Sequence, residues 1–464
     1  MAEARSVDLT QGPMASHFRT LAIPAALGMV FNTLYNMVDM FWAGRLSTDA
    51  VAGLSIGFMV LFVFIAFGFG LSSGVSALVG GAIGEKAKGR ASTFAGQALS
   101  FAAILSAVLM VLCLTLSPML IDLVSEPGAY RDAAQRYLAI LTLSIPGFVM
   151  AYACNGALQA QGDSVSLTRA LFGAFILNIF LNPLFIFGIP GLWGGMGFDG
   201  LAASTVVSQT LVLLYMIRQL FASPVVEGIG RSCFVPRVEA FRTLAAQMLP
   251  TSFSFQIMIL AGFAVQFALK EFGGDAIAAY GLGLRIEQLV LLPIVGVASS
   301  VLPIAAQNFG AKDYDRVREA VAFAVKVALV FMAVLCPVLW LGAEWALGLF
   351  TDDAEVVRIG VTYLHVDAVL LPVYAMLFII NSLLQALKRP VFVLWISVYR
   401  QGFGVAFFVW LLLTYWQWSL WSVWFGIGAS VVTGLVLSVF FADRVARQEM
   451  GGLWRRPAVA AKAG

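Results

Sequence analysis

The chain has 464 residues, of which 61% are hydrophobic and only 11% are charged. Because charged residues make up about 25% of an average soluble domain, this composition excludes an ordinary water-soluble protein and indicates an integral membrane protein. The net charge of +3 is small for a chain of this length, so it gives no indication of a nucleic-acid partner.

Apolar segments long enough for a membrane-spanning helix of about 20 residues recur along the whole chain. No alternation of apolar and polar residues typical of strands is present, and we therefore expect an all-α integral membrane protein with twelve transmembrane helices. The predicted helices cover 20–43, 50–83, 92–118, 137–160, 170–189, 198–217, 244–269, 276–308, 319–347, 359–387, 391–414 and 419–443.

Lys and Arg are distributed unevenly between the two sides of the predicted membrane. The N-terminus, the even-numbered loops and the C-terminus carry twenty of them, whereas the odd-numbered loops carry only Arg45, Arg131, Arg136, Lys270 and Arg358. Since an excess of Lys and Arg in short loops marks the cytoplasmic side, we expect both termini in the cytoplasm and a multi-pass protein of the inner, or plasma, membrane. The first residues lack the features of a signal peptide.

The cysteines and histidines predict neither a disulfide framework nor a metal centre. Cys113, Cys154 and Cys336 fall inside predicted helices and Cys233 falls in a cytoplasmic loop, which favours a role in packing. Two histidines and no close cluster of Cys, His or paired acids leave no set of structural metal ligands. Because the sequence also lacks a nucleophile with its base and a nucleotide-binding loop, we expect no enzyme and no cofactor.

The two halves of the chain match each other at one fixed offset of 226 residues. The match runs without a gap from the first predicted helix to the end of the fourth, and it loosens beyond Gly162. Representative pairs are Pro24/Pro250, Gly70/Gly296, Lys86/Lys312, Tyr137/Tyr363, Asn155/Asn381 and Gln159/Gln385.

This repeat predicts two pseudo-symmetric six-helix lobes around a central cleft. An offset that brings the first helix onto the seventh gives both lobes the same orientation in the membrane. We expect an N-lobe over 1–217, a cytoplasmic linker over 218–243, and a C-lobe with its cytoplasmic tail over 244–464. Parallel repeats of this kind are typical of transporters, because one lobe can rock against the other around a midplane site.

An acidic residue interrupts the first predicted helix. An Asp in the bilayer core costs roughly 2.5–3.5 kcal/mol on insertion scales, so a functional role is the first interpretation. Asn32, Tyr35, Asn36 and Asp39 recur at spacings of three and four residues, which places them on one helix face. We expect this face to point into the lobe or the cleft, while the alternative is a solvated Asp39 near the outer interface, close to Arg45.

The fifth predicted helix carries a second polar pair, Asn178 and Asn182, at positions i and i+4. Amides at this spacing can offer oxygens to a small cation or hydrogen bonds to a carboxyl group. The alternative for the pair alone is interhelical hydrogen bonding, worth about 0.6 kcal/mol per bond. Together with Asp39, the pair favours a polar site in the N-lobe.

At this point the sequence resembles the multidrug and toxic compound extrusion (MATE) family over nearly its whole length. The residues that carry the resemblance are Tyr35-x-x-x-Asp39-x-x-x-Ala43-Gly44, Gly80-Gly81-Ala82-Ile83-Gly84, Ala157-Leu158-Gln159-Ala160-Gln161-Gly162-Asp163, Asn178-x-x-x-Asn182-Pro183 and Ala306-Gln307-Asn308-Phe309-Gly310-Ala311. The resemblance implies a cation- or proton-coupling site at Asp39, Tyr35, Asn178, Asn182 and Thr205. If Na⁺ is bound, its ligands would come from Asp39, Asn178 and Asn182.

The C-lobe departs from one branch of this family. That branch uses a glutamate on the seventh helix and an aspartate on the tenth, and the matching positions here are Met258 and Tyr374, with only Gln256 nearby. The chain therefore resembles the DinF-like branch, in which coupling is expected in the N-lobe.

Further polar residues in predicted helices are candidates for the substrate cleft. These candidates are Asn36, Asn155, Gln256, Arg285 and Glu287. Arg285 and Glu287 are two residues apart and so lie on different faces of their helix, where a structural ion pair is as good an interpretation as coupling. For His365 and Asp367 the alternative is exposure at the outer surface, and for Lys326 and Arg400 it is snorkelling or pairing.

The expected function is secondary active antiport, in which amphipathic, often cationic organic compounds leave in exchange for H⁺ or Na⁺. The expected partners are such drugs or dyes, H⁺ or Na⁺ and membrane lipids, and the expected state is a monomer. Burial favours a neutral carboxyl group and a bound cation favours the charged one, so protonation of Asp39 could reorganise the first helix around Pro24, whose missing N–H permits a kink. The alternative is a lipid-linked precursor flippase of the same fold superfamily, which would need several cationic side chains for a pyrophosphate.

Overall fold

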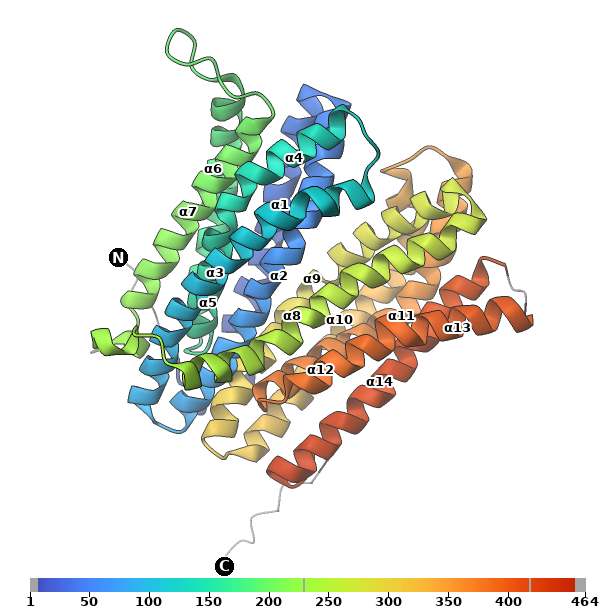
Figure 1. The fold of residues 1–464 in the computed structure, drawn as a ribbon. Helices are drawn as coiled ribbons and strands as arrows, with labels where there is room; N and C mark the ends of the chain where they lie inside the picture. The colour runs from blue at the N-terminus through green and yellow to red at the C-terminus, as the bar shows by residue number, and fades with distance from the viewer. Residues whose placement is uncertain (1–6, 228–229, 417–418, 455–464) are drawn as a thin grey trace, which may run out of the picture. The chain divides into compact units, whose positions relative to one another are not determined.

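The computed structural model describes residues 7–227, 230–416 and 419–454, and over these residues the chain is helical (Figure 1). The one β-type pairing there is an isolated bridge between Ile189 and Trp193. Twelve helical spans in the described ranges are long and apolar enough to cross a membrane. This confirms the all-α class and the predicted number of spans.

Ten of the spans are single helices and two are composite. The helices are α1 (Met14–Leu46), α2 (Thr48–Gly84), α3 (Lys88–Val124), α4 (Ala129–Leu141), α5 (Ile145–Gln159), α6 (Val165–Phe187), α7 (Asp199–Phe221), α8 (Val238–Leu269), α9 (Gly274–Gly310), α10 (Tyr314–Gly348), α11 (Ala354–Ala386), α12 (Pro390–Ser397), α13 (Val405–Leu411) and α14 (Trp421–Met450).

The composite spans follow from local departures from α-helical geometry. A 3₁₀ turn at Thr142–Ser144 joins α4 to α5 within the fourth span, directly before Pro146. A π-helical segment at Val398–Gly404 joins α12 to α13 within the eleventh. Segments of π-helix inside α-helices are rare and often mark functional sites.

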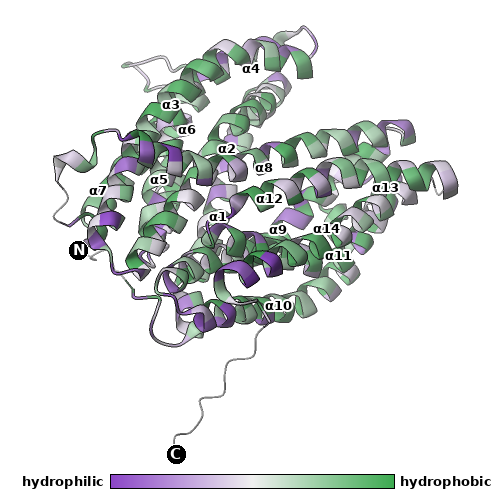
Figure 2. Cartoon of the chain, turned by 60° about the horizontal axis from the view of Figure 1, so that its bottom comes forward, coloured by the Kyte–Doolittle hydropathy of each residue, from purple (hydrophilic) through white to green (hydrophobic). Residues whose placement is uncertain are grey.

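Several helices run beyond the apolar segments predicted from the sequence, because polar caps and turns define their ends. The hydroxyl of Ser47 accepts a hydrogen bond of 3.0 Å from the Ala50 amide at the start of α2, which satisfies an otherwise free donor. Lys86 and Lys312 follow α2 and α9 with φ values of 56° and 61°, in the left-handed region that commonly ends a helix. Figure 2 shows long hydrophobic stretches along the helices, with hydrophilic residues gathered towards many of their ends.

The chain forms two compact units. Unit 1 comprises residues up to Leu9 together with Pro24–Ser252, and unit 2 comprises Thr10–Ile23 together with Phe253–Gly464. Two long helices, α1 and α8, are thus divided between the units. The divisions fall beside Pro24 in α1 and two residues after Pro250 in α8, which are partners in the 226-residue repeat.

In unit 1, α2 packs against α3, α4 and α5, and α6 packs against α7. Close approach between α2 and the first part of α8 depends on Gly70, because a Cβ there would lie 2.7 Å from the Met248 carbonyl oxygen. The segment expected to be a free linker is held to this unit. The side-chain amide nitrogen of Gln97 on α3 donates hydrogen bonds of 2.7 Å to the carbonyl oxygens of Cys233 and Val235.

In unit 2, α11 packs against α9, α10 and α14. Two arginines at the start of α10 bind the two ends of the chain that this unit contains. The Arg316 guanidinium donates to the Gly12 carbonyl oxygen at 3.0 Å, and that of Arg318 donates to the carbonyl oxygens of Met450 and Gly452 at 2.5 and 2.9 Å. The beginning of α1 and the end of α14 therefore lie at the same end of unit 2.

Candidate functional site

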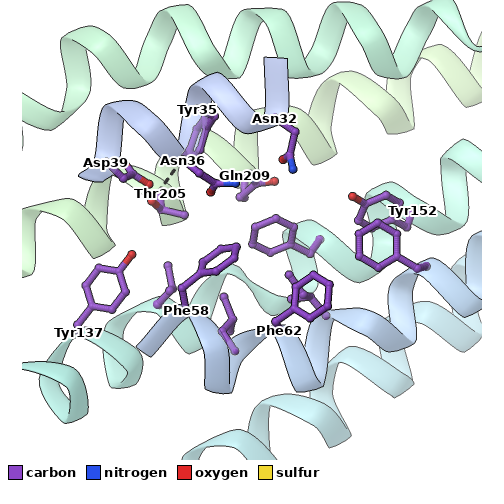
Figure 3. A pocket seen from close by; sticks show the side chains of 15 residues that line it. Asn32, Tyr35, Asn36, Asp39, Phe58, Phe62, Tyr137, Tyr152, Thr205 and Gln209 are labelled. Carbon is purple, nitrogen blue, oxygen red and sulfur yellow. Dashed lines mark hydrogen bonds between the residues drawn. The ribbon is translucent and has the colours of Figure 1, made fainter. Parts of the chain in front are cut away.

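One face of α1 lines a cavity inside unit 1. Asn32, Tyr35, Asn36 and Asp39, the four residues that share a face by spacing, all contribute to its wall. Figure 3 shows them along α1, across from aromatic rings of α2, α4 and α5. The face therefore points into its own unit.

Asp39 lies at this wall with only 5% of its surface exposed, which does not fit the alternative of a solvated acid. Its Oδ1 accepts hydrogen bonds from the side-chain amides of Asn178 and Asn182 on α6, at 2.9 and 2.8 Å. Hydrogen bonds to a charged acceptor are worth about 1.5–3 kcal/mol each. The two amides thus compensate part of the desolvation of the carboxylate.

The amide pair is itself fixed by its neighbours. The Asn182 amide nitrogen also donates to Asn178 Oδ1 at 3.0 Å, and the Ser204 hydroxyl on α7 donates to Asn182 Oδ1. Asn178 and Asn182 are fully buried. This network turns the amide nitrogens towards Asp39, so a bound Na⁺ would require amide oxygens to turn in their place.

The adjacent turn of α1 is tied to α7. The Tyr35 hydroxyl donates to Thr205 Oγ1 at 3.1 Å, and both side chains are buried. The five residues implied by the family resemblance, Asp39, Tyr35, Asn178, Asn182 and Thr205, therefore lie together at the meeting of α1, α6 and α7.

The rest of the cavity wall is mostly aromatic and aliphatic. Among the fifteen described residues that line it, Asp39 is the only one with an ionisable acid or base of high charge. The other lining residues are Phe58, Leu61, Phe62, Ile65, Phe69, Tyr137, Leu141, Phe148, Tyr152, Thr205 and Gln209. Aromatic faces attract organic cations, so this wall and the single carboxyl group suit a positively charged or amphipathic guest.

The size of the cavity limits what it holds in this conformation. Its volume is about 40 Å³, whereas a water molecule needs roughly 10–15 Å³ on this measure. It has room for a few water molecules and for a small cation, but drug-sized ligands occupy pockets of about 300–1,000 Å³.

Pro24 lies inside α1, ten residues from its beginning. Its carbonyl oxygen accepts a hydrogen bond of 2.6 Å from the Thr168 hydroxyl on α6. Asn155, one of the cleft candidates, lies away from the cavity wall and donates to the Ser72 hydroxyl on α2 at 3.1 Å. Asn155 thus joins α5 to α2.

The remaining candidates lie in unit 2 and do not form one group. Gln256 is half-buried on α8, Arg285 is exposed on α9, and Glu287 is buried on the same helix. The Tyr363 hydroxyl donates to Glu287 Oε2 at 2.7 Å. The two charged residues of α9 lie on different faces, as their spacing predicts, and Glu287 bonds to another helix.

Exposure of Asp367 at the outer surface, an alternative left open by the sequence, is wrong. Its side chain is 2% exposed, because α11 extends thirteen residues before it and other helices cover that face. His365, two residues earlier, is half-buried and stacks on Trp340 of α10 with ring centroids 4.2 Å apart. Lys326 is exposed, whereas Arg400 is half-buried.

Sequence reasoning missed several residues of the cavity. Ser204 contacts the amide network directly, although only its neighbour Thr205 was a candidate. Tyr137, Tyr152 and Gln209 line the wall opposite α1. A signal was available for Tyr137 alone, since it belongs to the 226-residue repeat.

Comparison with known proteins gives relatives along nearly the whole chain. A probable multidrug resistance protein, YoeA of Bacillus subtilis, is 27% identical over 422 residues, which are 89% of this chain and 90% of the relative. An FAD transporter of Shewanella oneidensis is 27% identical over 399 residues, covering 84% of this chain and 86% of the relative. Both names denote transporters or resistance proteins, and neither denotes an enzyme.

Solved structures have the same fold. A transporter of the MOP superfamily from Pyrococcus furiosus superposes with a TM-score of 0.87 at 23% identity, over 96% of this chain and 99% of that one. A multidrug resistance MATE transporter in an outward-facing conformation gives the same TM-score at 24% identity, over 96% and 99% of the two chains.

The family comparison also bears on the internal repeat. The model of the MatE family matches the chain twice, over residues 24–184 and 250–410. The two matches are separated by the same 226 residues, and they carry the register well beyond Gly162, where the sequence comparison alone loosened. On the evidence of these matches and of the shared fold, the chain belongs to the MATE family of multi-pass membrane transporters.

Proposed function

We propose that the protein is a cation-coupled efflux antiporter, which exports amphipathic and often cationic organic compounds in exchange for H⁺ or Na⁺. The observation that carries this proposal is the environment of Asp39, a buried carboxyl group with two amide donors at the wall of an aromatic cavity. An acid in this position is costly without a function. A cation that enters and leaves during transport gives it one.

In this proposal, Asp39 is the coupling group and its neighbours control access to it. A proton or Na⁺ neutralises the carboxylate, and the charge left after its release is stabilised by Asn178 and Asn182. Tyr35 and Thr205 hold the adjacent turn of α1 against α7. Binding at Asp39 would reorganise α1 around Pro24, where a missing backbone N–H lowers the cost of bending.

The substrate chemistry is inferred from the charge and the rings of the cavity wall. A single carboxyl group among aromatic rings favours an organic cation. Since the cavity is too small for such a molecule in this conformation, substrate binding requires the wall to open. The lining contains no Lys or Arg among its described residues, which argues against a lipid-linked pyrophosphate as substrate.

The orientation and location proposed here rest on the loop charges. The excess of Lys and Arg in even-numbered loops and at both termini favours cytoplasmic termini in the inner, or plasma, membrane. We further propose that the transporter acts as a monomer, since the cavity in unit 1 is complete within one chain.

The test is dye efflux from proteoliposomes with an imposed pH gradient or Na⁺ gradient, measured for the wild type and for Asp39→Asn. We expect the wild type to respond to one of the two gradients and the variant to lose that response. Asp132→Asn is the matched control, because Asp132 is an exposed acid of α4 outside the cavity. Gradient-driven efflux of unchanged rate in Asp39→Asn would rule out Asp39 as the coupling group.

A further inference from the structure

A second buried acidic cluster lies in unit 2. Glu287 on α9 and Asp367 on α11 are 9% and 2% exposed, and they are close enough to interact electrostatically. The Tyr363 hydroxyl, one helical turn before Asp367, donates to Glu287 Oε2 at 2.7 Å. Two acids of separate helices are thus buried beside one phenol.

The cluster contains polar atoms that nothing in the described chain satisfies. Asp367 Oδ2 is buried without a hydrogen-bond partner there, and so is the indole nitrogen of Trp424 on α14. The Trp424 ring lies 5.0 Å from the ring of Tyr363, so both unsatisfied atoms belong to the same region. Leaving a buried polar group without a partner costs about 1–3 kcal/mol, and more when the group is charged.

One cation accompanies the two acids. Arg400 lies in the π-helical segment between α12 and α13 and interacts electrostatically with Glu287. Its guanidinium carbon is 5.9 Å from the centre of the Tyr374 ring, and its aliphatic part packs on Gly434 of α14, where a Cβ would lie 3.0–3.2 Å away. Two carboxylates and one guanidinium leave one uncompensated negative charge.

The repeat shows that the scaffold itself does not require these acids. At the offset of 226, Glu287 corresponds to Leu61 and Asp367 corresponds to Leu141. Both leucines are buried, and both line the cavity of unit 1. Leucine therefore suffices for packing at these two positions, so the acids of unit 2 need another explanation.

We propose that Glu287 and Asp367 share one proton in a second proton-binding site, which loads and releases that proton during the transport cycle. The proton comes from water, forms an O–H bond with a carboxylate oxygen of the pair, and returns to water when the site opens. With one proton and Arg400 present, the two acids form a neutral cluster, and the proton supplies the donor that Asp367 Oδ2 lacks.

The groups around the pair favour a proton over a metal cation. The titratable or charged groups that interact with it are Tyr280 on α9, Cys336 on α10, Tyr363 and Tyr374 on α11, and Arg400. Arg400 would repel a second fixed cation, and no group of three His, Cys, Asp or Glu side chains suited to a metal occurs in the described part of the chain. His365 faces Trp340 instead.

This proposal rests on the proposed function only in that the proton serves transport. Its test therefore measures protonation directly, by infrared difference spectroscopy of the carbonyl band of protonated carboxyl groups as the pH of the purified full-length protein is changed. The series is Asp39→Asn alone and the same background with Glu287→Gln, with Asp367→Asn, or with Glu287→Leu and Asp367→Leu together. The leucine pair reproduces the residues that pack at the equivalent positions of unit 1, so it should fold.

We expect Asp39→Asn to retain a titrating carboxyl band and each added change to remove the intensity of one carboxyl group. Glu355→Gln, an exposed acid of α11, is the control and should leave the band unchanged. If the band of Asp39→Asn is unaffected by Glu287→Gln and by Asp367→Asn, the shared proton does not exist. If replacing choline chloride by NaCl at constant pH abolishes the band, the site binds Na⁺ and the proposal is wrong. A failure of Asp39→Asn to alter dye efflux would contradict the proposed function and leave this result intact.

Discussion

Tyr137 in unit 1 and Tyr363 in unit 2 occupy equivalent places in two copies of one scaffold. The ring of Tyr137 lies against Gly57 of α2, and the ring of Tyr363 lies against Gly283 of α9. Each tyrosine also contacts an aromatic ring that begins the last helix of its unit, Phe198 or Trp424. All three pairs have the offset of 226 residues.

Around this common packing, the polar groups differ completely. Unit 1 has an acid on its first helix, Asp39, whose equivalent in unit 2 is Val265. Unit 2 has its acids at Glu287 and Asp367, whose equivalents in unit 1 are leucines. The comparison teaches that helix packing and proton chemistry were assigned to separate positions, so each unit can be altered at its acids without altering the contacts that hold it together.

The strongest test of this comparison moves the acid from one unit to the other. Asp39→Val should lower ion-driven transport at least tenfold, or about 1.4 kcal/mol in coupling free energy, and adding Val265→Asp should not restore it. The positions equivalent to the amide donors are Gly404 and Phe408, which offer no side-chain amide. A buried acid without partners costs about 3–5 kcal/mol, so Val265→Asp should also lower thermal stability in detergent. Recovery of transport in the double variant would show that the two units are interchangeable.

The amides of α6 provide the next largest effect. Asn178→Ala and Asn182→Ala each remove a hydrogen bond to the Asp39 carboxylate, worth about 1.5–3 kcal/mol. We expect each to slow gradient-driven dye efflux roughly tenfold or more. Asn155→Ala is the control, since Asn155 is a buried amide of unit 1 that bonds to Ser72 instead. Equal effects at all three positions would mean that the amides act only through packing.

Much of this site could be predicted from the sequence because buried polar residues in a membrane helix are few and costly. Asp39, Asn178 and Asn182 stood out for that reason, and their spacing gave the faces on which they lie. The repeat gave the two-unit organisation through glycines and prolines such as Gly70 and Pro24, whose backbone roles tolerate few substitutes.

The depth of a residue could not be predicted in the same way. Asp367 lies early in its apolar segment, but α11 begins before that segment and neighbouring helices cover it. Nor could the sequence distinguish Ser204 from Thr205, because adjacent hydroxyls on a helix point in directions about 100° apart. Which of them meets α6 depends on the rotation of α7, which tertiary packing sets.

A third prediction concerns the packing that the two units share. A Cβ on Gly57 would lie 2.7 Å from Tyr137 Cδ1, and a Cβ on Gly283 would likewise meet the ring of Tyr363. Overpacking of this kind costs about 1–3 kcal/mol, so Gly57→Val and Gly283→Val should both lower the melting temperature measured by size-exclusion thermal scanning in detergent. Gly281→Val is the control in α9, because no atom lies within 4 Å of its added Cβ. A loss of stability in only one of the two variants would limit the common scaffold to that unit.

The smallest expected effect tests the contact that unit 1 has beside its acid and unit 2 lacks. Tyr35 donates to Thr205 at 3.1 Å, whereas the residue equivalent to Thr205 in unit 2 is Val431, which cannot accept a hydrogen bond. Tyr35→Phe, Thr205→Val and the double variant form a cycle, in which we expect a coupling energy of about 0.5–1.5 kcal/mol in the apparent affinity for the driving cation. Additive effects would show that Tyr35 and Thr205 act independently on Asp39. A non-additive result would instead show that the position of α1 against α7 is what the cation senses, and this position has no counterpart in the valine-lined equivalent of unit 2.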